Sequence, residues 1–239
     1  MVLHLVDLFR EPGVVVKTAS LCEEHEALYP EEAALVATAV EKRRTEFRAG
    51  RSCARKALGE LGITGFPLLA SKDRAPIWPP SVVGSITHTD GCTGGYCAAA
   101  VAIQRIALSL GLDAEPRLPL PDEVWPLVLD AEEVSAACHA AEPGVHARLI
   151  FSAKETTYKA LFPAYKRFLE FSDVHVDLLP RQGIFFSELV GSARALGLSE
   201  KRLMGRMVVD HEILVTGMIL SPAGFALAQE GISIHHVPC

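Results

Sequence analysis

Helical and strand patterns follow one another twice along this chain, and that order constrains its fold more than any other feature. Apolar residues recur at helical spacing from Pro30 to Gly62, and acidic residues follow Pro30, as is common at a helix start. Strand-like segments come next at residues 82–87, 96–103 and 106–113. Helical patterns return at 121–129, 132–141 and 146–161, and four more strand-like segments follow at 174–177, 183–189, 202–209 and 213–220.

The repeated order predicts an α+β fold made of two similar halves, residues 1–108 and 109–239. Segments 51–58 and 154–161 both end in Lys-Ala-Leu, each on a predicted helix. This similarity agrees with a duplication, although chance explains it equally well.

Composition narrows the class of protein. The 239 residues are 49% hydrophobic, which is enough to fill a sizeable core and argues against a disordered chain. The net charge of −6 argues against a general nucleic-acid binder, which is normally basic. The first ten residues lack the cationic start of a signal peptide. No apolar run approaches the roughly 20 residues of a membrane span. The cysteines are scattered, without a C-x-x-C pair. We therefore expect a cytoplasmic protein with reduced thiols, without a membrane or nucleic-acid partner.

Two carboxylates close the apolar segment at 106–113. Asp113 and Glu115 are two residues apart, so on an extended strand their side chains point to the same face. Magnesium prefers hard oxygen ligands of this kind and usually binds one or two carboxylates, with phosphate and water completing its shell. The alternative is a solvated strand end followed by a turn at Pro116, and the Asp-x-Glu pattern alone does not separate the two.

The helical segment at 151–161 carries charged side chains among small and apolar ones. Glu155 and Lys159 are spaced i, i+4 and share one helix face, while Lys154 lies about 100° around the helix. One interpretation is an exposed ion pair, which contributes only about 0.3–0.5 kcal/mol. The bulky neighbours Phe151 and Tyr158 favour the other interpretation, in which the charges line a cleft.

Five arginines gather in the first helical pattern: Arg43, Arg44, Arg48, Arg51 and Arg55. If the helix is continuous, four of them fall within roughly 60° on one face, where like charges repel one another. An anion would offset this repulsion, because a guanidinium binds phosphate with two parallel hydrogen bonds. A phosphate site and a solvated face, with Glu41 and Glu46 as partners, fit the pattern equally well.

His88 follows the predicted strand at 82–87 and precedes a glycine turn at Gly91. A histidine at such a strand end could donate a hydrogen bond to a phosphate, although a lone histidine is more often structural. The chain contains no G-x-S-x-G nucleophile elbow and no Walker or dinucleotide-binding glycine motif, so these classes of site are not supported.

Six stretches, taken together and in order, carry a family resemblance: residues 42–47, 50–58, 74–79, 83–88, 111–116 and 151–163. The combination of Asp-Ala-Glu-Pro with Phe-Ser-Ala-Lys-Glu-x-x-Tyr-Lys-Ala is highly specific. The chain resembles the Sfp-type 4′-phosphopantetheinyl transferases, and within them the branch of the enterobactin synthase component D. The similarity covers about residues 40–171, more than half of the chain.

The resemblance implies two α+β halves related by a pseudo-twofold axis, with the active site between them. It implies transfer of the phosphopantetheine arm of coenzyme A to a serine of an apo acyl or peptidyl carrier protein, with release of adenosine 3′,5′-bisphosphate. Mg²⁺ is the expected cofactor, with Mn²⁺ as a possible substitute. The partners would be acidic helical carrier domains of fatty-acid, polyketide or nonribosomal-peptide synthases, and the enzyme is expected to be a monomer of secondary-metabolite biosynthesis.

The resemblance also implies roles for individual residues. Catalytic roles fall on His88, Asp113, Glu155 and Lys159. Metal ligands fall on Asp113, Ala114, Glu115 and Glu155. Contacts to coenzyme A fall on Arg43, Arg51, Lys72, Asp73, Arg74, Thr87, His88, Lys154, Lys159 and Phe168. Relatives often carry a basic residue where this chain has Ala70, and Lys72 or Arg74 is expected to take its place.

Several questions stay open at this point. Glu155 is either the base for the serine hydroxyl or only a metal ligand, because a carboxylate bound to a metal is a weaker base. A magnesium-dependent phosphohydrolase would use the same acidic residues with water as the nucleophile. A non-catalytic module would bind coenzyme A or a carrier protein without turnover, but the complete set of Asp113, Glu115, Glu155 and Lys159 argues against it.

Overall fold

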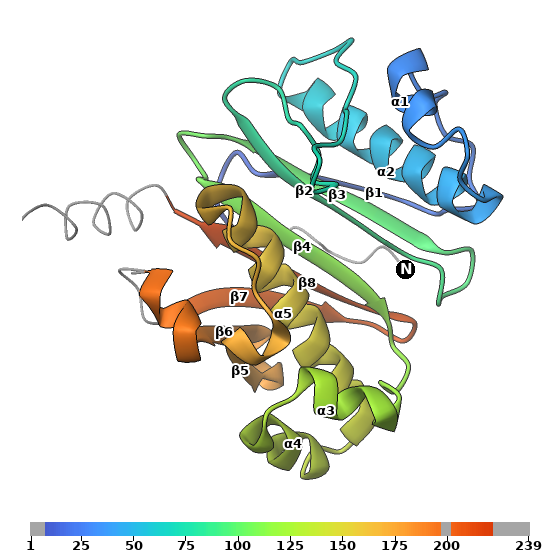
Figure 1. The fold of residues 1–239 in the computed structure, drawn as a ribbon. Helices are drawn as coiled ribbons and strands as arrows, with labels where there is room; N and C mark the ends of the chain where they lie inside the picture. Colours follow the sequence, from blue (N-terminus) through green and yellow to red (C-terminus); the bar gives the residue numbers. More distant parts are fainter. Residues whose placement is uncertain (1–7, 197–201, 222–239) are drawn as a thin grey trace, which may run out of the picture.

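The computed structural model describes residues 8–196 and 202–221, which form two antiparallel sheets (Figure 1). The first sheet has the strand order β1 (Val15–Ala19), β3 (Tyr96–Ile103), β2 (Val82–Thr89). The second has the order β4 (Ser109–Pro116), β8 (Ile213–Leu220), β7 (Leu203–Val209), β6 (Ile184–Leu189), β5 (Val174–Leu179). One long helix packs on each sheet, α2 (Glu41–Glu60) on the first and α5 (Pro143–Tyr165) on the second. The α+β class predicted from the sequence is confirmed.

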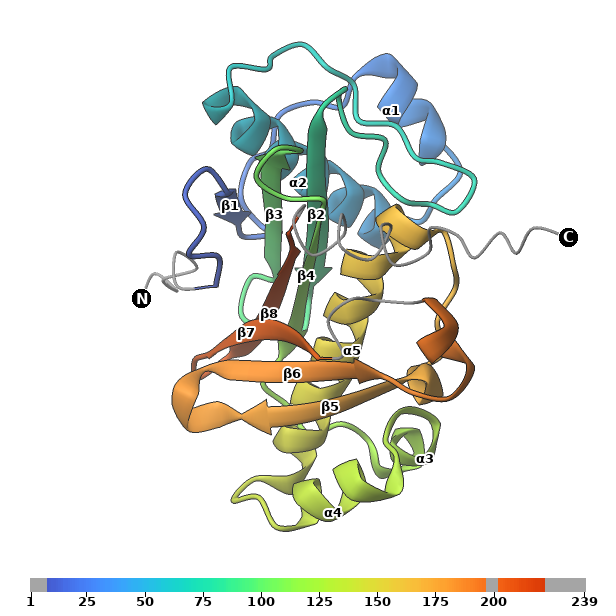
Figure 2. The same ribbon diagram turned by 90° about the vertical axis from the view of Figure 1, so that its left-hand side faces the viewer.

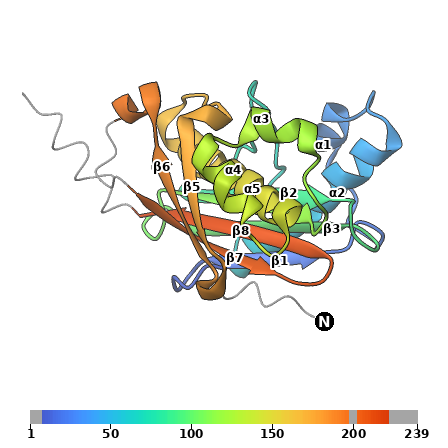
Figure 3. The ribbon, with the colours of Figure 1, turned by 90° about the horizontal axis from the view of Figure 1, so that it is seen from below.

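Shorter helices complete the molecule. They are α1 (Pro30–Leu35), α3 (Trp125–Val128) and α4 (Ala131–Cys138), with single turns of 3₁₀ helix at η2 (Asp122–Val124), η3 (Phe171–Asp173), η4 (Pro180–Gln182) and a longer one at η5 (Gly191–Leu196). Figure 3 shows α3, α4 and α5 on the same side of the second sheet. The strands predicted in the last third of the chain are all present, with ends shifted by no more than two residues.

The single helix predicted from Pro30 to Gly62 is in fact two helices, α1 and α2, separated by residues 36–40. In one continuous helix, Glu32 and Arg55 would lie about 35 Å apart, at 1.5 Å per residue. The break lets the chain fold back, so that Arg55 donates to Glu32 Oε2 at 2.8 Å. Glu32 is fully buried and also accepts the N–H of Leu68 at 2.8 Å. Gly50 lies inside α2 and marks no bend.

Small side chains on β3 let the first sheet pack on both faces. Ala98 and Ala100 lie in the apolar cluster that contains Leu112 of β4, whereas Ala99 lies in the cluster that contains Ala54 of α2. All of these side chains are fully buried. Because successive side chains of a strand alternate between faces, a run of alanines can bring a helix and a second strand layer close to the same strand.

The two sheets meet where β2 lies beside β4 (Figure 2). Side-chain hydroxyls make this junction: Ser85 Oγ accepts the N–H of Leu112 at 3.1 Å, and Thr87 Oγ1 accepts the N–H of Ala114 at 2.9 Å. The two hydroxyls thereby satisfy backbone donors of β4, which would otherwise be buried without a partner. Residues of both sheets are therefore in contact at the end of β4 that carries the acidic pair.

The chain passes from the first sheet to the second through a turn. The N–H of Ile106 donates to the carbonyl of Ile103 at 2.9 Å, so the strand predicted to begin at 106 begins only at Ser109. The N–H of Leu108 already bonds to Leu220 of the second sheet at 2.8 Å. A boundary between residues 108 and 109 stays a prediction for the two halves.

The sequence predicted no membrane-spanning segment and reduced cysteine thiols. No helix within the described ranges is long and apolar enough to cross a membrane. The cysteines of this part of the chain, Cys22, Cys53, Cys92, Cys97 and Cys138, are free thiols.

Gly111 generates a stability prediction, because α5 crosses β4 at this residue. A Cβ atom at Gly111 would lie 2.0 Å from the carbonyl oxygen of Thr156, which is main chain and cannot move cheaply. Gly111→Ala should therefore lower the free energy of unfolding by about 2 kcal/mol or more. Gly59→Ala, at an exposed site of α2 with no neighbour within 4 Å, should leave it unchanged or raise it by up to about 1 kcal/mol. Urea denaturation checks both, and equal effects would contradict this view of the packing.

Candidate active site

The acidic pair at the end of β4 faces α5. Asp113 and Glu115 both bond to side chains of that helix, as their two-residue spacing predicted. Ala114 points the other way, and its methyl group is buried in the cluster between the sheets. Since a methyl group holds no metal, only the backbone carbonyl of Ala114 could act as a ligand.

Asp113 has two hydrogen-bonded side-chain partners, whereas Glu115 has one. It is 5% exposed, and its Oδ1 accepts a hydrogen bond from Lys159 Nζ at 2.6 Å. Its Oδ2 accepts from Ser152 Oγ at 2.8 Å, and Ser152 is bonded in turn to Thr216 Oγ1 of β8 at 2.8 Å. These partners fix the orientation of the carboxylate between α5 and the sheet.

Glu115 pairs with Arg148 rather than with a lysine. Arg148 donates to Glu115 Oε2 at 2.7 Å. Burial, as the largest cause, and the negative charge of Asp113 together raise the pKa of Glu115 to about 7, although Arg148 and Lys159 lower it.

Glu155 lies on the same side of α5 as Lys159, four residues earlier. Burial raises the pKa of Glu155, Lys159 lowers it and Asp113 raises it. Within the described ranges, its carboxylate accepts no hydrogen bond. Burial lowers the pKa of Lys159, but Asp113, Glu155 and Glu115 together outweigh this and raise it. Lys159 is therefore a cation at neutral pH.

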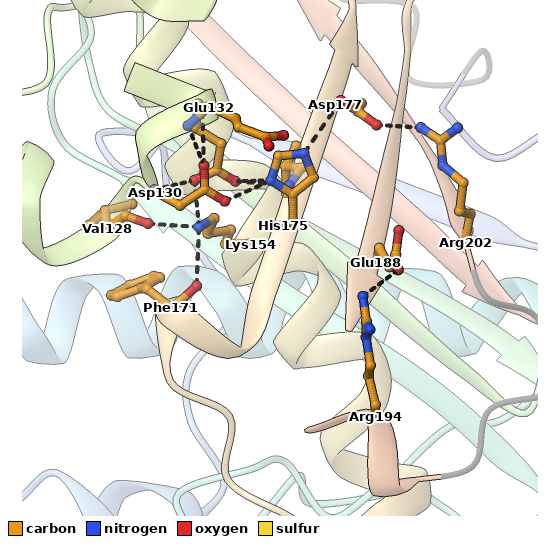
Figure 4. Close-up of polar contacts among 12 residues, drawn as sticks. Val128, Asp130, Glu132, Lys154, Phe171, His175, Asp177, Glu188, Arg194 and Arg202 are labelled. Carbon is orange, nitrogen blue, oxygen red and sulfur yellow. Dashed lines mark hydrogen bonds and ion pairs between the residues drawn. The ribbon is translucent and has the colours of Figure 1, made fainter. Parts of the chain in front are cut away.

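Lys154 does not join Lys159. It is 2% exposed, and its Nζ lies 2.8 Å from Glu133 Oε2 and donates to the carbonyls of Val128 and Phe171 at 2.7 and 3.1 Å (Figure 4). The resemblance implied a contact of this ammonium with coenzyme A. The helix turns it about 100° away from that side, toward α4 and η3.

A second acidic cluster surrounds this lysine. Ligand atoms of Asp130, Glu133 and His175 lie within 4.8 Å of one another, whereas those of Asp113, Glu115 and Glu155 do not meet this distance in the described part of the chain. The spacing of these ligand atoms would allow the triad to hold a metal ion. Burial lowers the pKa of His175, but Asp130, Glu133 and Asp177 outweigh this and raise it. The ammonium of Lys154 already pairs with Glu133 Oε2 at 2.8 Å, and we interpret the cluster as a buried ion network.

A basic group lies at the end of β2. Arg43 NH1 is 3.2 Å from His88 Nε2, and Glu46 Oε2 is 3.5 Å from Arg43 and 3.8 Å from His88. Burial lowers the pKa of His88, Glu46 raises it, and Arg43 lowers it, with a net decrease. His88 is therefore largely neutral at pH 7. The adjacent Thr87 is buried, and its hydroxyl accepts the N–H of Ala114, as described above.

The five arginines do not form one patch. Arg44 pairs with Glu41 at 2.9 Å, and Arg55 pairs with Glu32. Of the remaining three, Arg48 is exposed, and Arg43 lies beside His88.

Arg51 is buried below the loop that follows α2. Its Nε donates to the carbonyl of Leu68 at 2.9 Å, and its guanidinium lies 3.9 Å from the ring centre of Phe47. Burial lowers the pKa of Arg51 to about 10, which Glu32 opposes and nearby Arg43 reinforces. Arg51 remains a cation at pH 7, close enough to Arg43 for the two charges to interact.

A cavity of about 690 Å³ lies beside Lys159, and its lining does not include Arg43, Arg51, Thr87, His88, Asp113 or Glu155. Its walls come from both sheets and α5, and include Asp73, Arg74, Trp78, Ser85, Tyr158 and Lys159. Lys72 is exposed and is not one of the lining residues. A smaller hollow of about 100 Å³ is lined by Glu155, Tyr158 and Phe168, with the Phe168 ring 5.5 Å from that of Tyr158. Tyr158 borders both, so the two spaces adjoin the same stretch of α5.

Sequence comparison with known proteins identifies the family of this chain. The sequence model of the 4′-phosphopantetheinyl transferase N-terminal domain matches residues 31–102, and that of the 4′-phosphopantetheinyl transferase superfamily matches residues 109–202. The 4′-phosphopantetheinyl transferase Svp of Streptomyces mobaraensis is 44% identical over 209 residues, which cover 83% of this chain and 81% of the relative. The chain belongs to the 4′-phosphopantetheinyl transferases.

Other transferases of this family give the same picture. The transferase PptT of Mycobacterium tuberculosis is 38% identical over 80% of this chain and 85% of the relative. Enterobactin synthase component D of Salmonella typhi is 32% identical over 66% of this chain and 61% of the relative. The resemblance stated from the motifs is confirmed. Transferases of this family move the 4′-phosphopantetheine group of coenzyme A to carrier proteins, and this chain is assigned that reaction.

Two residues of the site were not found by sequence reasoning, namely Arg148 and Ser152. They precede Glu155 by seven and three residues, so helical spacing could have placed them on its face. Thr216 could not have been found in this way, since it lies 60 residues or more from its partners Ser152 and Thr156.

The buried ion network generates a stability prediction. Lys154→Met keeps the length of the side chain but leaves Glu133 buried without its cation, and should lower the free energy of unfolding by about 3 kcal/mol or more. Arg194→Met is the control, because Arg194 and Glu188 form an exposed pair at 3.1 Å (Figure 4) and should contribute no more than about 1 kcal/mol. Chemical denaturation at pH 7 measures both, and losses of the same size would show that the buried pair has no special weight.

Proposed function

We propose that Asp113, Glu115 and Glu155 of this transferase hold a divalent ion, Mg²⁺ or Mn²⁺. The donor set fits such an ion, because carboxylate oxygens are the hard ligands that magnesium prefers. Glu115 offers Oε1, since only its Oε2 is bonded to Arg148. The raised pKa values of Glu115 and Glu155 reflect burial and crowded negative charge, which a cation would relieve. The carbonyl of Ala114 is a further candidate ligand.

We further propose that coenzyme A occupies the 690 Å³ cavity. Its 3′-phosphate would extend beyond the lining of this cavity to Arg43 and Arg51, where two cations are close to one another. His88 and Thr87 would donate to phosphate oxygens, and Asp73 and Arg74 would border the adenosine. Tyr158 and Phe168 would form a wall of the pantetheine channel. Lys154 is left out of this set because its ammonium is bound to Glu133, and Lys72 could contact the nucleotide only from outside the cavity.

The observation that carries the mechanism is the pair of Asp113 with Lys159, which lines this cavity and lies one helical turn from Glu155, which lines the adjoining hollow. The serine oxygen of a carrier protein would attack the phosphorus nearest the pantetheine, and the bond from that phosphorus to the bridging oxygen would break. Glu155 would take the hydroxyl proton on the carboxylate oxygen that it does not offer to the ion, because a serine hydroxyl is a poor nucleophile without a base. Lys159 would stabilise the charge of the departing adenosine 3′,5′-bisphosphate. A bound divalent ion would draw charge from the pyrophosphate oxygens.

The partners are proposed at the level of their class. They would be acidic helical carrier domains of fatty-acid, polyketide or nonribosomal-peptide synthases, and the name of one relative, an enterobactin synthase component, supports a role in secondary metabolism. We propose a cytoplasmic monomer. The family assignment favours transfer over hydrolysis of coenzyme A, in which water would replace the serine.

The role of Glu155 generates a kinetic prediction. Glu155→Gln should slow transfer by about 10²–10⁴-fold, the usual contribution of a general base, and leave the Kd for coenzyme A within about threefold. Conversion of apo to holo carrier, followed by chromatography, and calorimetric titration of coenzyme A measure the two effects. Glu132→Gln, an exposed acid on α4, is the matched control and should behave like the wild type. Wild-type turnover in Glu155→Gln would contradict the role of Glu155 as the base.

The 3′-phosphate site generates a binding prediction. Arg43→Ala should weaken the binding of coenzyme A by about tenfold. A hydrogen bond from a charged group at a partly exposed site contributes on the order of 1.5 kcal/mol. It should change the binding of dephospho-coenzyme A little. Arg44→Ala removes the neighbouring exposed arginine, which is paired with Glu41, and should affect neither ligand. Equal losses for both ligands in Arg43→Ala would show that Arg43 does not read the 3′-phosphate.

A further inference from the structure

One face of α5 carries a row of polar side chains, three of which bond to the acidic end of β4. Arg148, Ser152, Glu155 and Lys159 follow one another at steps of four, three and four residues, which keeps them on one helix face. Ser152 and Lys159 bond to Asp113 at 2.8 and 2.6 Å. Arg148 is the first residue of the row, and of the four it is the one that bonds to Glu115.

Arg148 is held at all three of its nitrogens. Nε donates to the carbonyl of Leu118 at 2.6 Å, NH2 donates to that of Pro119 at 2.9 Å, and NH1 donates to Glu115 Oε2 at 2.7 Å. The Arg148 side chain is 14% exposed and that of Glu115 is 20% exposed. The two carbonyls belong to the segment directly after β4, so the guanidinium is anchored to the backbone and is not a mobile surface partner.

This anchoring fixes one oxygen of Glu115 and leaves the other without that bond. We propose, on the basis of the metal site put forward above, that Arg148 is a positioning residue, which orients Glu115 as a single-oxygen ligand of the divalent ion. Partners that orient metal ligands in this way commonly change metal affinity by about 10–100-fold when they are removed. A guanidinium that merely competed with the ion for Glu115 would have the opposite effect, since its removal would strengthen metal binding.

The sign of the change in metal affinity separates the two roles. Mn²⁺ is titrated into the full-length enzyme with coenzyme A present and carrier protein absent, so that no turnover occurs, and free Mn²⁺ is read by electron paramagnetic resonance. Arg148→Gln should weaken Mn²⁺ binding by about tenfold or more. Arg148→Lys keeps the charge but has a single nitrogen in place of the three that reach Leu118, Pro119 and Glu115, and should weaken Mn²⁺ binding less. Unchanged or tighter binding in Arg148→Gln overturns the proposal; if that variant does not fold, unchanged or tighter binding in Arg148→Lys does so.

Three controls keep the result specific. Arg117→Gln removes a neighbouring arginine that pairs with Glu142, and should leave Mn²⁺ binding unchanged. The Kd for coenzyme A, measured in chelator, should stay within about threefold in both Arg148 variants, because a general structural defect would weaken it too. Asp113→Asn tests the metal site itself. If it abolishes Mn²⁺ binding while Arg148→Gln does not weaken it, the role of Arg148 is wrong and the metal site stands; if it has no effect, the metal site is wrong.

Discussion

The contact between α5 and β4 is the constraint on which the rest of this structure depends. Gly111 has no side chain, so the main chain of α5 can approach the strand closely at Thr156. Two residues further along β4, Asp113 bonds to Ser152 and Lys159 of the same helix. Packing and polar contacts thus set a single register between helix and strand. That register brings Glu155, whose carboxylate accepts no hydrogen bond from the described residues, to the acidic end of β4.

A second side of α5, about 100° around the helix from Glu155, strengthens the same arrangement. Lys154 directly precedes Glu155 in the chain, and its buried pair with Glu133 joins α5 to α4, while its bond to Phe171 joins it to η3. Removing one partner of a buried pair leaves an uncompensated charge, which commonly costs about 3–5 kcal/mol. The helix is therefore held on two sides, and the position of the proposed base between them follows from contacts made by its neighbours.

Sequence patterns predicted those parts of the fold that depend on local periodicity. The strand at 96–103 matches β3, because its apolar run is bounded by turn signals. β1 was missed, since its five residues are mostly half-buried and show no clear alternation. The break between α1 and α2 depends on Glu32 meeting Arg55, a contact between residues 23 positions apart that periodicity does not register. In the site, the two-residue spacing placed Asp113 and Glu115 correctly, but the direction taken by Lys154 depends on Glu133, 21 residues earlier.

The most direct test of the account is the intact mass of an apo carrier protein incubated with the wild-type enzyme, coenzyme A and Mg²⁺. The account predicts a mass gain of one phosphopantetheine group on the carrier, which disappears when a chelator removes the metal. A carrier of unchanged mass, with free phosphopantetheine or phosphate released from coenzyme A, would contradict it and favour hydrolysis by the same acidic residues.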